Sequence, residues 1–208
     1  MYRIIATLIF IFGGVSASFA PASSEDAWSF SVQPKESRFT VKVGKAGFLK
    51  AFGHDHLIEI RAVVGDVDWR PDNPEKSSIR IEIDASSLAV IDEGISDADR
   101  ATIQADMESK ALDVTNYPKI VFVSKELSVS SGDGERKGNL KGALTLRGVT
   151  NEVKILLTLT VGDQKLRAQG EFKIKGSDFG VPQIKAAGGS VKTKNELELT
   201  FDLVATRN

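Results

Sequence analysis

Short segments of this chain alternate apolar and polar residues with a period of two. In the segment 38–43, Phe39, Val41 and Val43 are apolar and the residues between them are polar. The same alternation occurs in four further segments, 79–84, 153–161, 166–174 and 197–203. Because successive side chains of a β-strand point to opposite faces, each segment has one apolar face. A sheet of such strands must cover that face or roll up around it, which predicts a mainly β protein with an apolar interior.

The first residues have the pattern of a secretory signal peptide. Arg3 precedes a short apolar stretch from Ile4 to Phe12, and small residues follow up to Ala22. The apolar stretch is far shorter than the roughly 20 residues that span a membrane, so cleavage is expected and not anchoring. We predict a signal peptide over 1–22, a single domain over 23–208, and a periplasmic or secreted location.

Composition and missing motifs exclude several classes of protein. The chain has no cysteine, which rules out a disulfide scaffold, thiolate catalysis and zinc–thiolate sites. It has 27 basic and 28 acidic residues, a balance without the basic excess that nucleic-acid binding needs. Gly-x-Ser-x-Gly, Walker and Gly-x-Gly-x-x-Gly motifs do not occur in the sequence. We therefore expect no enzyme, no cofactor and no nucleic-acid partner.

One stretch, 96–112, departs from the strand pattern. Ile103, Met107 and Ala111 are spaced by four on one helical face, and Ser96 is a good N-cap. This predicts one short α-helix that plugs or flanks a barrel. Extended segments are expected near 28–32, 38–43, 57–69, 79–83, 120–124, 140–146, 153–161, 166–174 and 197–204. The segment 57–69 is expected to run without a break, with Ile58, Ile60, Ala62 and Val64 on one side.

Both histidines of the chain lie in one cluster, Gly53–His56. If the segment is extended, His54 and His56 project to the same face, as a His-x-His metal pair requires. The sequence indicates no third ligand. Local hydrogen bonding, contact with a ligand head group, metal binding and acid–base catalysis therefore all remain open.

The loop before the histidines carries Phe48 and Phe52, which is more apolar surface than a connecting loop normally has. Two interpretations are equally consistent with this pattern. The aromatic side chains either fold back to plug a barrel or form the mouth of an apolar pocket.

The strand ends and turns resemble those of the YceI-like family, exported bacterial proteins associated with polyisoprenoid lipids. The resemblance spans about 28–203. It is carried by Phe30-Ser31-Val32 with Pro34, Ser37 and Phe39, by Gly65, by Tyr117–Phe122, by Gly142 with Leu144–Thr150, and by Ser177–Val181. It implies an extended, lipocalin-like antiparallel β-barrel whose apolar interior holds an isoprenoid chain, such as a polyprenyl quinone or polyprenyl phosphate.

The barrel that this resemblance implies needs an apolar lining and a few polar groups at its mouth. The expected lining residues are Phe39, Val41, Phe48, Phe52, Ile81, Phe122, Leu144, Phe172 and Phe179. The expected mouth residues are His54, His56 and Asp178. The expected partner is an isoprenoid lipid, with transient membrane contact. Two alternatives remain, a metal-binding protein or metal-dependent enzyme centred on His54 and His56, and a structural or adhesion module with a solid core.

Overall fold

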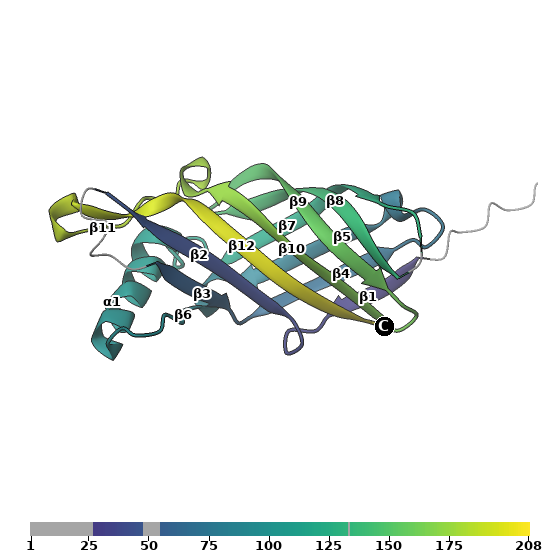
Figure 1. The fold of residues 1–208 in the computed structure, drawn as a ribbon, viewed down its shortest axis with the longest axis horizontal. Coiled ribbons are helices and arrows are strands. Elements are labelled where there is room, and N and C mark those ends of the chain that lie inside the picture. The colour runs from purple at the N-terminus through teal and green to yellow at the C-terminus, as the bar shows by residue number, and fades with distance from the viewer. Residues whose placement is uncertain (1–26, 48–54, 133) are drawn as a thin grey trace, which may run out of the picture.

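The computed structural model describes residues 27–47, 55–132 and 134–208, which form an elongated antiparallel β-barrel with one helix (Figure 1). The strands are β1 Trp28–Val32, β2 Arg38–Ala46, β3 His56–Ile60, β4 Val63–Trp69, β5 Ser78–Asp84, β6 Leu88–Val90, β7 Lys119–Val129, β8 Glu135–Leu146, β9 Val149–Val161, β10 Lys165–Lys175, β11 Lys185–Ala186 and β12 Val191–Arg207. The helix α1 spans Asp97–Asp106 and continues into a π-helical segment, Met107–Leu112. Short 3₁₀ turns cover Pro74–Lys76, Ala85–Ser87, Gly176–Phe179 and Ala187–Gly189. The predicted fold class is confirmed.

Eight strands close the barrel in the order β1, β4, β5, β7, β8, β9, β10, β12 and back to β1. The last strand, β12, makes the closure, because one of its edges pairs with β1 near Ala205 and with β2 from Asp202 to Lys192. Its other edge pairs with β10 along eleven residues. Strands β3 and β6 extend the sheet beyond β2. The barrel thus has a helix end, where α1 and β11 lie, and a C-terminal end, where the chain finishes (Figure 1).

The prediction of one continuous strand over 57–69 is wrong, because the strand is interrupted at Arg61 and Ala62, between β3 and β4. The N–H of Ala62 donates to the hydroxyl of Ser87, outside the ladder. This break shifts the alternation by one residue, so Val63 is buried whereas Val64 is 62% exposed. A shift of one residue moves every following side chain to the other face of a sheet.

The helix α1 lies between β6 and β7 in the chain and packs against the free edge of β6, and the predicted helix is confirmed. The Ser96 hydroxyl caps it by accepting the N–H of Asp99. The side-chain amide of Gln104 then binds the free edge of β6: it accepts the N–H of Val90 at 2.9 Å and donates to the carbonyl of Leu88 at 2.8 Å. At the other end of the helical segment, the Arg147 guanidinium donates to two backbone carbonyls. In the described ranges, no helix is long and apolar enough to cross a bilayer.

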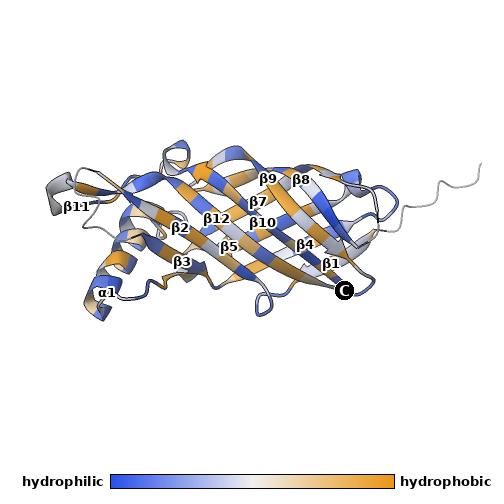
Figure 2. Cartoon of the chain, viewed as in Figure 1, coloured by the Kyte–Doolittle hydropathy of each residue, from blue (hydrophilic) through white to orange (hydrophobic). Residues whose placement is uncertain are grey.

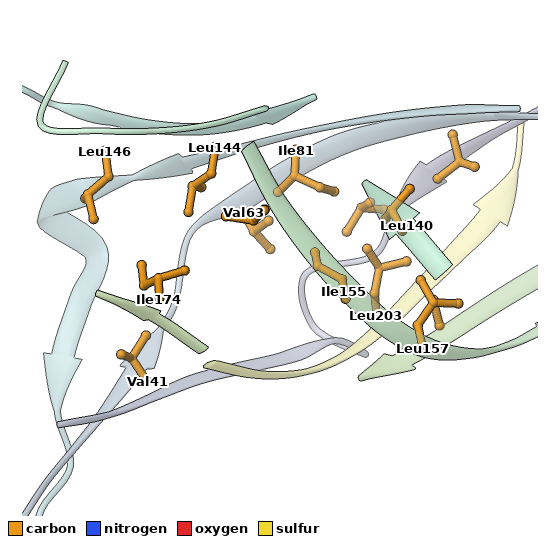
Figure 3. Packing of buried hydrophobic residues seen from close by; sticks show 14 of the residues in the cluster. Val41, Val63, Ile81, Leu140, Leu144, Leu146, Ile155, Leu157, Ile174 and Leu203 are labelled. Carbon is orange, nitrogen blue, oxygen red and sulfur yellow. The ribbon is translucent and has the colours of Figure 1, made fainter. Parts of the chain in front are cut away.

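The core is the inside of the barrel. Along the strands hydrophobic and hydrophilic residues alternate, as Figure 2 shows, and the inward residues form one cluster of buried side chains (Figure 3). Large residues face small ones across the sheet: Ile81 is paired with Gly65, and Phe201 with Gly170. Phe122 lies over Gly142 in the same way. Each glycine leaves the space that its large neighbour occupies.

Candidate ligand-binding site

An apolar tunnel of about 200 Å³ lies inside the barrel. Six of the residues expected to line it do so: Phe39, Val41, Ile81, Phe122, Leu144 and Phe172. Among the described residues that line it, Thr40 and Thr200 alone carry side-chain hydroxyls. The solid-core alternative requires an interior filled completely by side chains. The structure instead leaves this cavity open.

The tunnel wall contains further residues that were not singled out from the sequence. Ile155, Ile174, Leu197 and Leu199 are inward members of the strand segments whose alternation was recognised. The period-two pattern could have identified them. Met107 also lines the tunnel from the helical segment, on the face that the spacing by four indicates.

A wider chamber of about 590 Å³ lies at the helix end and forms the mouth. It shares Val43, Ile58 and Met107 with the tunnel, so the two spaces adjoin. Its walls carry opposite charges. The lysines Lys45, Lys185 and Lys192 come from the strands β2, β11 and β12, and the carboxylates Asp99 and Asp106 come from α1.

His56 lines this mouth and is held there by Asp92. Its Nδ1 lies 2.7 Å from one oxygen of the Asp92 carboxylate, and the N–H of Leu57 donates to the other oxygen at 2.6 Å. Asp92 is only 7% exposed. Because an ionised carboxylate only accepts hydrogen bonds, Nδ1 is the donating nitrogen of His56 beside it, and Nε2 is then an acceptor. Sequence reasoning missed Asp92, since 36 residues separate it from His56 and no motif connects them.

Asp55, between the two histidines, is bound to the strand β2. It accepts the backbone N–H of Lys45 at 3.1 Å and lies 3.7 Å from the ammonium group of Lys42. The hydrogen bond from Lys45, with smaller contributions from nearby lysines, lowers the pKa of Asp55 below its ordinary value. Asp55 therefore ties the start of β3 to β2 and does not line the mouth.

Of the remaining expected site residues, the described ones, Phe179 and Asp178, line neither the tunnel nor the mouth. Phe48, Phe52 and His54 lie outside the described residues. Phe179 was expected in the lining; it is buried in the turn after β10, where it belongs to the hydrophobic core, and it does not line the tunnel. Asp178 is exposed on the same turn, where its backbone carbonyl accepts a hydrogen bond from Asn151, and it lines neither cavity.

The metal alternative depended on a third ligand beside His54 and His56. Within 27–47, 55–132 and 134–208, no three or more His, Cys, Asp or Glu side chains are grouped as metal ligands would be. In the same part of the chain, His56 has Asp92 as its partner.

Comparisons with known proteins agree with this geometry. A family model described as the YceI-like domain matches residues 30–205. A UPF0312 protein from Pseudomonas syringae pv. tomato is 31% identical over 139 residues, which cover 62% of this chain and 63% of the relative. The match thus spans less than two thirds of that curated protein.

Two solved structures share the fold. BcnA from Burkholderia cenocepacia superposes with a TM-score of 0.65 at 22% identity, covering 84% of this chain and 99% of that structure. A polyisoprenoid binding domain from Saccharophagus degradans, implicated in plant cell wall breakdown, superposes with a TM-score of 0.60 at 13% identity, covering 87% and 99%. At these identities the likeness concerns the fold.

Proposed function

The chain belongs to the YceI-like domain family, and from this premise we propose that it binds an isoprenoid lipid and holds the chain of that lipid in the barrel tunnel. The observation that carries the proposal is the tunnel itself, whose wall is built almost wholly of apolar side chains. The name of the Saccharophagus degradans domain, which has the same fold, also supports it. The activity would be transport, storage or sequestration, without a reaction.

Hydrophobic burial supplies the free energy for such binding. Each Å² of apolar surface removed from water contributes about 25 cal/mol, so a hydrocarbon chain gains affinity with every segment that enters. A branched isoprenoid chain suits a wall of branched and aromatic residues such as Ile81, Leu144 and Phe122.

We place the polar head group in the mouth. The ammonium groups of Lys185 and Lys192 would donate hydrogen bonds to a phosphate or a quinone carbonyl there, whereas Nε2 of His56, with the proton on Nδ1, would accept one from the hydroxyl of a protonated phosphate. Polyprenyl phosphates and polyprenyl quinones differ in this head group. The proposed location is periplasmic or secreted, and it rests on the signal-peptide pattern of residues 1–22, which lie outside the described part.

Two neighbouring residues of β9 provide the test. Ile155 is 5% exposed and lines the tunnel, whereas Leu156 is 70% exposed on the outer surface. An Ile155→Phe variant narrows the tunnel and should weaken binding of a fluorescent polyprenol at least about tenfold. A loss of this size corresponds to one or two methylene groups of the ligand that no longer fit into the tunnel. Leu156→Phe adds similar bulk outside and should bind as the wild type does.

Circular dichroism melting of both variants shows whether the barrel remains folded. If a folded Ile155→Phe protein binds the polyprenol as tightly as Leu156→Phe, the tunnel is not the binding site.

A further inference from the structure

We propose that a second, smaller chamber beyond the tunnel receives the tail of the isoprenoid and sets the longest chain that the protein accepts. This inference rests on the proposed function. The chamber has a volume of about 50 Å³ and shares two residues, Ile79 and Leu140, with the tunnel. These two side chains therefore stand between the tunnel and the chamber.

The strand β8 passes the tunnel and then the chamber, so its residues show the order of the two cavities along the barrel. Its inward residues include Leu146 and Leu144 in the tunnel, then Leu140 at the boundary, then Arg136 nearer the hairpin tip. Leu146 precedes the turn that contacts the helical segment, so it lies toward the helix end. Figure 3 shows Leu140 and Leu157 on the opposite side of the cluster from Leu146 and Ile174. At about 3.4 Å per residue, β8 advances about 20 Å from Leu146 to Leu140.

An isoprenoid tail in this chamber would contact almost only apolar side chains. Its wall includes Val67, Leu157, Leu159, Leu166 and Ala168. Three serines also border it, but the hydroxyl of Ser124 already accepts the N–H of Ile79, and that of Ser77 accepts the N–H of Arg70, both at 2.9 Å. A space with so few polar partners does not retain water, and an apolar tail is its natural occupant.

The chamber ends at Trp69. This side chain is 2% exposed, and the guanidinium carbon of Arg136 lies 5.0 Å from the centroid of its ring. Among the described residues, Nε of Arg136 is a buried donor without a hydrogen-bond partner. The end of an isoprenoid chain that enters from the mouth therefore meets the indole ring of Trp69, which is in contact with the guanidinium of Arg136. A longer chain would have to displace this cation–π contact, which hydrocarbon cannot replace.

Ala168 allows the chamber to be filled without touching the tunnel. It is 7% exposed and lines the chamber but not the tunnel. Ala168→Leu should weaken binding of the longest prenol that the wild type accepts at least about tenfold, and leave farnesol within about twofold. Its matched control is Gln169→Leu, the next residue, which points outward. The probes are prenols of graded length, from farnesol through geranylgeraniol to solanesol, all with the same hydroxyl head.

A second variant works in the opposite direction. Leu140→Ala opens the boundary between tunnel and chamber, and should raise affinity for long prenols relative to farnesol. Retained farnesol binding shows that each variant is folded.

The outcomes separate the two proposals. If both variants change the affinity for all chain lengths equally, or not at all, the chamber does not set chain length and the lipid-binding function stands. If the wild type binds no prenol of any length, the proposed function fails, and the inference fails with it.

Discussion

At the scale of single residues, the interior depends on glycines that make room for large neighbours. A Cβ on Gly142 would lie 2.7 Å from the carbonyl oxygen of Val123 and closer still to the ring of Phe122. Gly142→Ala should therefore lower the free energy of unfolding by about 1–3 kcal/mol, the usual cost of overpacking a core. Urea denaturation measures this value.

Gly162 is the control for that substitution. A Cβ on Gly162 would have its nearest neighbour, the carbonyl oxygen of Lys165, 3.6 Å away, so Gly162→Ala should cost little. Equal stabilities for the two alanine variants would show that Phe122 moves aside freely.

Asp92 is the residue on which the position of His56 depends. Asp92→Ala leaves the N–H of Leu57 and Nδ1 of His56 without their shared acceptor, in a site where Asp92 is buried. Both hydrogen bonds are part-buried, and because each contributes about 0.5–1.5 kcal/mol, we expect a loss of about 1–3 kcal/mol in urea denaturation. Glu93→Ala, an exposed neighbour, should change nothing. An Asp92→Ala variant with the same free energy of unfolding as the wild type would mean that water replaces the carboxylate without loss of stability.

These residue-level features differ in how far sequence predicts them. The tunnel residues Phe39, Val41 and Ile81 follow from alternation, because strand geometry alone decides which face they occupy. Phe179 lies on a turn, where period two gives no direction, so alternation could not predict which way its side chain points. Asp92 meets His56 only through tertiary folding.

At the scale of elements, α1 replaces a missing strand beside β6. The single side chain of Gln104 satisfies an N–H and a carbonyl of that edge. Gln104→Ala should expose both groups, and the backbone N–H of Val90 should exchange with deuterium about tenfold faster. Hydrogen–deuterium exchange with mass spectrometry measures this.

Ser109→Ala is the matched control, because its hydroxyl donates to the carbonyl of Ala105, within the helical segment itself. Unchanged exchange at Val90 in the Gln104→Ala variant would show that the edge of β6 is held by other contacts.

The same scale explains which elements the sequence predicts. Long strands such as β9 and β10 repeat the alternation often enough to be recognised, and α1 has both a cap and a period of four. The strands β6 and β11, with three and two residues, are too short to show any period. The break between β3 and β4 depends on Ser87 of a distant segment, so local pattern could not reveal it.

At the scale of the whole molecule, eight strands set the width of the barrel. A barrel of this strand number is just wide enough to be filled by side chains or to hold one small ligand. Alternation predicts the apolar interior but not its filling, because filling depends on the summed volumes of side chains from all strands. The structure shows that space is left along the axis, in the tunnel and its two neighbouring chambers.

The most direct test of the account is mass spectrometry of protein purified from its own host without detergent, first intact and then after extraction with organic solvent. We predict one lipid per protein molecule, and an extracted mass that fragments into isoprene units. Protein that carries no lipid, or a lipid without an isoprenoid chain, would contradict the account.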